Sequence, residues 1–181
     1  GRWVRAWILA VLHSRSARQS ANQAAWRLGI PWIDAGVSGA ERLARIDIYA
    51  PGRDQPCLEC QWSDEDYALL EQRHLCQPDS NSSSPASFAT NAPAYLGAFA
   101  ASLAINEAER ILNDEPLAEI AGRQILFEMR HQSHFVTSLR KHSGCRFDHS
   151  TWRVEQSTRP LREMRLSDLL TECPSANHDN K

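Results

Sequence analysis

The chain has 181 residues, a length that suits one compact domain, and its 42% hydrophobic content with six tryptophans is enough to form a core. A formal net charge of −2 gives no reason to expect nucleic acid or an anionic membrane as a partner. Because no apolar run approaches the roughly 20 residues of a membrane-spanning helix, we predict a soluble, cytoplasmic protein. We expect one domain over residues 1–174 and a disordered tail over residues 175–181.

The first part of the chain predicts two strands joined by a helix. Trp3 to Leu12 is a nearly continuous apolar run, which is typical of a strand buried on both faces of a parallel sheet. Pro31 to Val37 has the same character. The order strand, helix, strand indicates an α/β fold with a Rossmann-like sheet and flanking helices. Because a core-like strand opens the chain, we expect this sheet to be incomplete at its N-terminal side.

The helix between these strands has clear start and stop signals. It is predicted over residues 17–28, which are rich in Ala, Gln and Arg. Ser14 or Ser16 can cap its start, and Gly29 is its stop signal.

The rest of the chain alternates between strand and helix signals. Residues 42–49 alternate charged and apolar side chains and predict a half-exposed strand. A short helix follows Ser63 and Asp64, and residues 77–89 are too polar to pack and predict a flexible loop. The clearest helix spans residues 92–112. Two further segments are strand-like, 125–127 and 135–137.

A Cys-x-x-Cys pair, Cys57 and Cys60, lies on a predicted turn and can supply half of a tetrahedral zinc site. The best candidates for the other half are Cys145 and His149. A redox couple is an alternative, but such motifs open a helix, and here the helix begins only after the pair. A disulfide fits poorly with five cysteines, an odd count, and unrelated buried thiols are the remaining interpretation.

The ordered combination of these features resembles the C-terminal half of the ThiF/MoeB/HesA adenylyltransferases, bacterial relatives of ubiquitin-activating enzymes, over roughly residues 8 to 150. The features that carry the resemblance are Asn22 and its helix, Gly29-Ile30-Pro31, Gly36 to Gly39, Pro51, Cys57-x-x-Cys60 before Trp62, and the helix entered by Thr90-Asn91-Ala92-Pro93. The resemblance implies an enzyme that uses Mg-ATP to adenylate the C-terminal glycine of a ubiquitin-like or sulfur-carrier protein. It also implies a structural zinc ion held by two cysteine pairs, and a homodimer or a partner chain.

The sequence departs from the family pattern in three places. The glycine-rich loop that binds ATP phosphates has no counterpart in this chain. His13 stands where the family has an acidic residue that helps to hold the magnesium nucleotide, and a neutral imidazole is a poor ligand for that ion. The second cysteine pair is replaced by Cys145 with Asp148 and His149. We favour His149 as the fourth zinc ligand, with Asp148 as the alternative.

Three further residues are candidates for function. Cys76 is a possible catalytic acceptor of the activated carboxyl group, and its alternative is a half-buried thiol at a helix end. Arg18 and Asn22 lie four residues apart on one helical face near the expected nucleotide pocket, where His13 also lies. Their alternative is a solvated helix face.

These observations lead to two hypotheses. The chain is part of an ATP-dependent adenylyltransferase that activates a ubiquitin-like or sulfur-carrier protein. Alternatively, it is a non-catalytic, zinc-stabilised module that binds such a protein or a catalytic partner chain.

Overall fold

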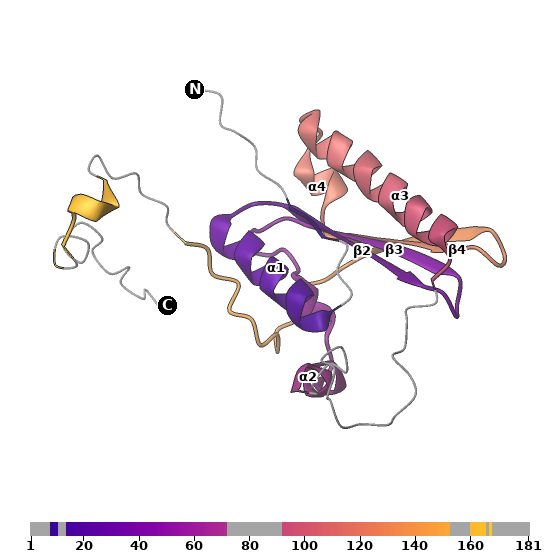
Figure 1. Ribbon diagram of the computed structural model, residues 1–181, viewed down its shortest axis with the longest axis horizontal. Coiled ribbons are helices and arrows are strands. Elements are labelled where there is room, and N and C mark those ends of the chain that lie inside the picture. The colour runs from indigo at the N-terminus through magenta and orange to yellow at the C-terminus, as the bar shows by residue number, and fades with distance from the viewer. Residues whose placement is uncertain (1–7, 11–13, 72–91, 153–159, 166, 168–181) are drawn as a thin grey trace, which may run out of the picture.

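The computed structural model describes residues 8–10, 14–71, 92–152, 160–165 and 167, and these form a mixed α/β fold (Figure 1). The strands are β1 (Ile8–Ala10), β2 (Trp32–Ser38), β3 (Leu43–Tyr49), β4 (Arg123–Glu128) and β5 (Ser133–Ser138). The helices are α1 (Arg15–Leu28), α2 (Asp64–Glu71), α3 (Ala94–Leu112) and α4 (Leu117–Ile120), with 3-10 segments η1 (Leu58–Gln61) and η2 (Leu161–Glu163). The expected mixed α/β class is confirmed.

The five strands form one sheet in the order β1-β2-β3-β4-β5. Strands β1 and β2 pair in parallel, and α1 connects them, as the predicted strand–helix–strand unit requires. The other three pairs are antiparallel. For β2–β3 and β4–β5 this follows from their connections, which are too short for a crossover. Within the described residues, the arrangement expected of a Rossmann-like sheet is therefore limited to the first pair.

Helix α1 begins and ends at the predicted signals. The Ser14 side chain accepts a hydrogen bond from the Ala17 amide and caps the start. Gly29 adopts a left-handed conformation with φ of 67° and caps the end. The helix thus begins two residues earlier than predicted, directly after its cap.

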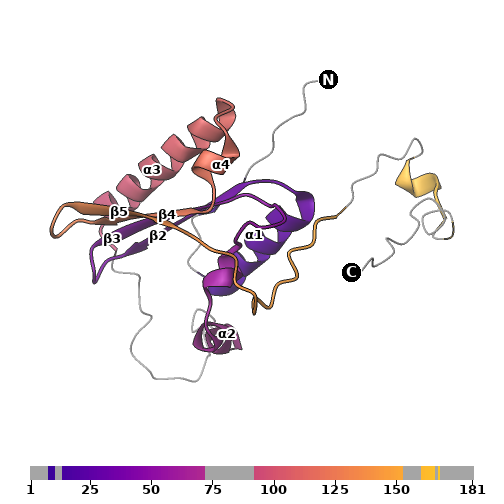
Figure 2. The ribbon, with the colours of Figure 1, turned by 180° about the vertical axis from the view of Figure 1, so that it is seen from behind.

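Helices cover both faces of the sheet, with α1 on one side and α3 on the other (Figures 1 and 2). On the α3 side, Ile33, Ile46 and Ile48 pack against the helix in the largest apolar cluster. The helix turns its alanines to the sheet, since Ala100, Ala104 and Ala108 are all buried. Small side chains let the helix approach closely, so this face is a conventional apolar core.

The α1 side of the sheet is different, because it combines aromatic and charged residues. Trp32 and Tyr49 are fully buried and stack with ring centroids 5.0 Å apart. Asp34 and Asp47 are fully buried on the same face. The prediction that β3 is half-exposed is therefore wrong: Asp47 is fully buried and Arg45 is only partly exposed, and the two form an ion pair.

Several predictions fall outside the described residues. They are the strand segment before Ile8, His13, the loop over residues 77–89, Cys76 and the tail over residues 175–181. In the described part of the chain, no helix has the length and apolar character needed to span a membrane.

Candidate metal centre and adjoining cavity

The first half of the candidate metal centre is formed by η1, a single turn that begins directly after Cys57. The turn directs both sulfurs to the same side, with Cys57 Sγ and Cys60 Sγ 3.7 Å apart. The Cys57 amide donates to Cys60 Sγ at 3.4 Å. The Leu58 amide donates to the side-chain oxygen of Asn22 at 3.1 Å, which ties η1 to α1.

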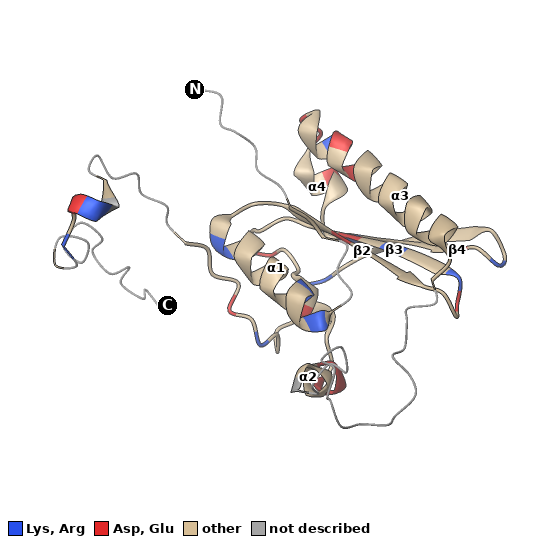
Figure 3. Cartoon of the chain, in the orientation of Figure 1, with Lys and Arg blue, Asp and Glu red and all other residues tan. Residues whose placement is uncertain are grey.

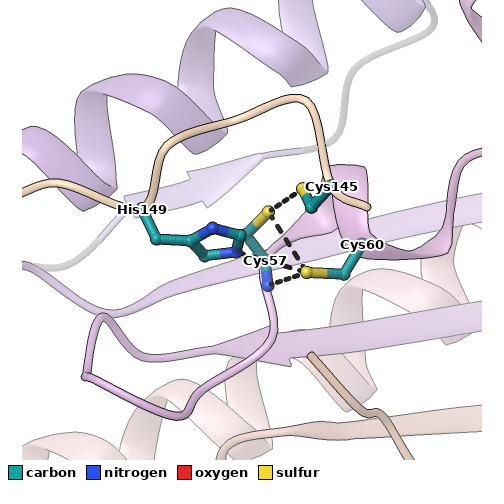
Figure 4. A group of neighbouring side chains, drawn as sticks. All are labelled: Cys57, Cys60, Cys145 and His149. Carbon is teal, nitrogen blue, oxygen red and sulfur yellow. Dashed lines mark hydrogen bonds between the residues drawn. The ribbon is translucent and has the colours of Figure 1, made fainter. Parts of the chain in front are cut away.

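The second half comes from the segment that follows β5 (Figure 4). Cys145 Sγ lies 3.7 Å from Cys57 Sγ, and His149 Nε2 lies 3.2 Å from Cys60 Sγ. One ligand atom from each of the four residues lies within 4.8 Å of all the others. The four residues that we predicted from the sequence as zinc ligands come from two distant segments, and the structure brings them together.

The geometry of this cluster, which we call the Cys3His cluster, fits a zinc ion. Two sulfurs bound tetrahedrally to zinc at about 2.3 Å lie about 3.8 Å apart. The distances from Cys57 Sγ to Cys60 Sγ and to Cys145 Sγ, both 3.7 Å, are close to that edge length. Three thiols and one imidazole are also a donor set that zinc prefers over harder cations. The four residues therefore could hold zinc as a closed tetrahedral site.

Asp148, the alternative fourth ligand, is directed away from the cluster. Its side chain is 59% exposed and its carboxylate pairs with Arg27 at 3.0 Å. The neighbouring Ser150 amide also donates to it. His149 therefore lies with the three cysteines, whereas Asp148 attaches this segment to α1 through its ion pair with Arg27.

Aromatic side chains surround the Cys3His cluster. Trp26 is almost fully buried and contacts the His149 ring edge-to-face, with centroids 4.8 Å apart. Phe147 packs on the same tryptophan with ring centroids 6.0 Å apart, and the Arg27 guanidinium lies over the Phe147 ring at 5.2 Å. These contacts fix the segment between Cys145 and His149 against α1 and keep water away from the sulfurs.

The thiols of the cluster differ in acidity. The pKa of Cys60 is lowered, first because the Cys57 thiol donates a hydrogen bond to it, and further by backbone amides and His149. The same hydrogen bond, with burial, raises the pKa of Cys57. Burial also raises the pKa of Cys145. The hydrogen bond from Cys57 thus favours the thiolate form of Cys60.

A cavity of about 510 Å³ adjoins η1. Leu58, which lies between Cys57 and Cys60 in the sequence, forms part of its wall. Small residues from β2 and from the start of α3 line it, among them Gly36, Ala94 and Gly97. Three arginines also line it: Arg15, Arg18 and Arg45.

Two of these arginines, Arg18 and Arg45, belong to a buried ionic network on the α1 face of the sheet. Figure 3 colours the acidic and basic positions of the chain red and blue, including those on the strands. Asp34 is fully buried and lies 3.3 Å from Arg18 Nε and 2.8 Å from Arg45 Nη2. Arg45 also pairs with buried Asp47 at 3.1 Å, and Gln124 donates to Asp47 at 2.9 Å. Burial raises the pKa of both aspartates, and the facing arginines oppose that rise.

Sequence reasoning missed this network because it depends on strand register. Asp34 is paired with Asp47 across β2 and β3, and Asp47 is paired with Gln124 across β3 and β4. One local signal could have indicated it: an aspartate inside the otherwise apolar segment Pro31 to Val37 requires a cationic partner if it is buried.

Gly36 gives room to the Arg18 side chain. A Cβ atom at Gly36 would lie 2.9 Å from Arg18 Nη2, closer than two such atoms normally approach. An alanine at this position would therefore make the guanidinium shift from its present place beside Asp34.

The structure separates the two helix residues that the sequence grouped near a nucleotide pocket. Arg18 lines the cavity, whereas Asn22 is fully buried and supports η1. The alternative of a solvated helix face is wrong for Asn22, because the residue is covered by η1. His13 and Cys76 lie outside the described residues, so their predicted roles remain predictions.

Comparisons with known proteins identify the fold. No protein-family model matches the chain, and no curated protein matches it significantly. Several solved structures do match. The crystal structure of E. coli MccB has a TM-score of 0.56 and 18% identity over 85% of this chain and 42% of its own. E. coli MccB with ATP has a TM-score of 0.50 and 21% identity over 77% and 38%.

A third match is the microcin C7 biosynthetic enzyme MccB in complex with N-formylated MccA. Its TM-score is 0.52 at 16% identity, over 77% of this chain and 40% of that one. The chain thus shares the fold of part of MccB and spans about two fifths of the length of these structures.

Proposed function

We propose that this chain is the zinc-stapled part of an adenylyltransferase domain related to ubiquitin-activating enzymes. Its task there is to receive the C-terminal residues of a ubiquitin-like or sulfur-carrier protein. The observation that carries the proposal is the cavity of about 510 Å³, which lies beside η1 and is lined by small residues from β2 and α3. An extended chain end rich in glycine suits such walls, because it needs little lateral room.

The comparisons support a polypeptide as the ligand. MccB, whose fold this chain shares in part, has been solved with N-formylated MccA. The resemblance of the sequence to the ThiF/MoeB/HesA family points to the same class of partner. Arg18 and Arg45 line the cavity, and their guanidinium N–H groups that do not face Asp34 or Asp47 can donate to the carbonyl oxygens of a bound chain end.

Zinc has a structural role in this proposal. Cys57, Cys60, Cys145 and His149 would fill all four tetrahedral positions and leave none for a substrate. The ion would join the segment after β3 to the segment after β5, and so fix the wall that η1 contributes to the cavity.

The described residues are less suited to bind the phosphates of ATP than to bind a zinc ion. A triphosphate needs unpaired cations or a glycine-rich loop of backbone amides. The three cavity arginines already face carboxylates: Arg15 pairs with Asp66, Arg18 with Asp34, and Arg45 with Asp34 and Asp47. The sequence also contains no phosphate-binding glycine motif. A phosphate site would therefore have to come from outside these residues.

This charge pairing favours a second candidate function, a non-catalytic module. Such a module would keep the Cys3His cluster and the cavity, bind the same ubiquitin-like protein or a catalytic partner chain, and perform no ATP chemistry. In the catalytic case we propose Cys76 as the acceptor of the activated carboxyl group.

One pair of measurements separates the two functions. ATP–pyrophosphate exchange with a ubiquitin-like or sulfur-carrier protein reports adenylation, and fluorescence anisotropy of a labelled C-terminal peptide reports binding. Exchange together with binding supports the adenylyltransferase. Binding without exchange supports the module. If Arg18→Ala binds the peptide as tightly as the unmodified chain and the control Arg53→Ala, the cavity is not the binding site and both proposals fail.

A further inference from the structure

Helix α2 is attached to the rest of the protein in an unusual way. Of its side chains that the structure describes, residues 64–70, none is buried. Helix α3, by contrast, buries six residues against the sheet. Most helices in proteins are held by an apolar face. In α2, Tyr67 packs edge-to-face on the nearby Trp62 with centroids 5.2 Å apart, and the contacts described next are with charged and polar groups.

One set of contacts connects α2 to the two segments of the Cys3His cluster. Arg146, the neighbour of Cys145, donates to Asp64 at 2.6 Å and lies 4.1 Å above the Tyr67 ring. The Tyr67 hydroxyl donates at 3.0 Å to Glu59, which lies between Cys57 and Cys60 and is 2% exposed. Both halves of the cluster are therefore contacted by α2.

Glu59 transmits this contact to α1. Its carboxylate also accepts hydrogen bonds from Gln19 at 2.9 Å and from Gln23 at 3.2 Å. The buried carboxylate thus joins α1, η1 and α2 through three neutral donors, and Tyr67 is the donor that α2 contributes.

A second contact connects α2 to the cavity. Asp66 forms an ion pair with Arg15, which lines the cavity. The same carboxylate accepts a hydrogen bond from the Ser63 amide at 2.9 Å, and Ser63 Oγ accepts one from the Asp66 amide, so Asp66 also closes the first turn of α2. A carboxylate that entered the cavity and bound Arg15 would compete directly with Asp66.

We propose that α2 is a polar latch, a helix whose docking depends on Arg15 in the cavity and on Arg146 beside the metal cluster. An anionic occupant of the cavity that takes Arg15 removes one of these two ion pairs and so loosens α2, while the sheet and α1 stay folded. Ion pairs at a partly exposed surface are individually weak and are screened by salt. Occupancy of the cavity thereby weakens the attachment of α2 without releasing its contacts to Arg146 and Glu59. This inference stands whether or not the chain takes part in adenylation.

Hydrogen exchange measured by mass spectrometry on the zinc-loaded chain tests the latch. Asp64→Asn removes the Arg146 pair from the α2 side, where the carboxylate is 93% exposed, and leaves the cluster segments unchanged. Arg15→Gln removes the cavity-side pair. We expect each variant to speed exchange of the α2 amides by roughly two- to fivefold, and the double variant by roughly tenfold. Amides of α1 and α3 should keep their rates, and so should all amides in the control Arg53→Gln.

Two outcomes overturn the proposal. If the α2 amides of both single variants exchange at the unmodified rate, the ion pairs do not hold the helix. If α1 amides accelerate as much as those of α2, the helix is an integral part of the fold and not a latch. Raising the salt concentration on the unmodified chain should reproduce the effect of the double variant on α2 alone.

Discussion

Cys60 Sγ lies 3.2 Å from His149 Nε2, although 89 positions separate the two residues. This contact joins the turn after β3 to the segment after β5. Between them the chain forms α2, α3, α4 and two strands. The cluster thus closes a large part of the fold, and its integrity should affect both stability and the shape of the cavity.

Loss of one sulfur should release the metal and weaken the fold. We expect Cys60→Ser to bind no zinc at equilibrium and to lose about 3 kcal/mol or more of unfolding free energy, because structural zinc contributes folding energy directly. Metal analysis of the purified protein and chemical denaturation measure both effects. Cys173→Ser is the matched control. Full zinc content in Cys60→Ser with an unchanged denaturation midpoint would rule out the metal centre.

The fourth ligand can be assigned by comparing two neighbouring positions. We expect His149→Ala to weaken zinc binding by at least roughly 100-fold, since even groups that only orient a ligand change affinity by 10- to 100-fold. Asp148→Ala should leave affinity close to normal and cost less than about 1 kcal/mol, because it removes an exposed pair with Arg27. Competition with a chromophoric chelator gives the affinities. A larger loss of zinc affinity in Asp148→Ala than in His149→Ala would identify Asp148 as the fourth ligand.

The buried network should be sensitive to the loss of its central carboxylate. Asp34→Asn leaves Arg18 without its aspartate and Arg45 with only Asp47, so we expect a loss of about 3 kcal/mol in unfolding free energy. Urea denaturation at neutral pH measures it. Glu41→Gln, at an exposed position near the same strands, is the control. A loss below about 1 kcal/mol would show that water already satisfies both arginines.

Gly36 and Arg18 should be coupled. Gly36→Ala places a methyl group 2.9 Å from the guanidinium, and the long side chain can yield, so we expect a cost of about 1 kcal/mol. In an Arg18→Ala background the same change should leave the unfolding free energy nearly unaltered, because the guanidinium that the methyl group would contact is then absent. A double-mutant cycle of unfolding free energies gives the coupling. Equal costs in the two backgrounds would contradict the contact.

The contribution of Asp66 should depend on pH. Its pKa is lowered, first because the Ser63 amide donates to it, and also because Arg15 faces it. A carboxylate with a lowered pKa in the folded state stabilises the fold above its unfolded value of about 4, and the benefit is lost as the pH falls through the folded pKa. The stability difference between the unmodified chain and Asp66→Asn should therefore be full at neutral pH and shrink in acid. A difference that grows in acid would contradict this assignment.

The predictable part of the fold was the part with local signals. Ser14 and Gly29 fix the ends of α1 by contacts within a few residues, and the spacing of Cys57 and Cys60 places two sulfurs on one turn. The meeting of that turn with Cys145 is not a local property. It could be predicted only as a hypothesis from the residue types that suit one metal ion.

The parts that could not be predicted depend on how distant segments align. The alternation of Arg45 and Asp47 with apolar neighbours is typical of a half-exposed strand, and it gave the wrong burial for β3. Only the register of β3 with β2 and the position of Arg18 on α1 show that these charges neutralise one another. Cross-strand register is set by the whole sheet and has no signal within one strand.

The register of β2 with β3 also limits which substitutions the chain can tolerate. Arg18, Asp34, Arg45 and Asp47 balance two positive against two negative charges, so loss of one leaves the group with an uncompensated charge. Single substitutions at these positions should be poorly tolerated, whereas a combined replacement by apolar residues of similar size can preserve the fold. Among diverged copies of this sequence, the four positions should therefore covary, either keeping all four charges or exchanging them together.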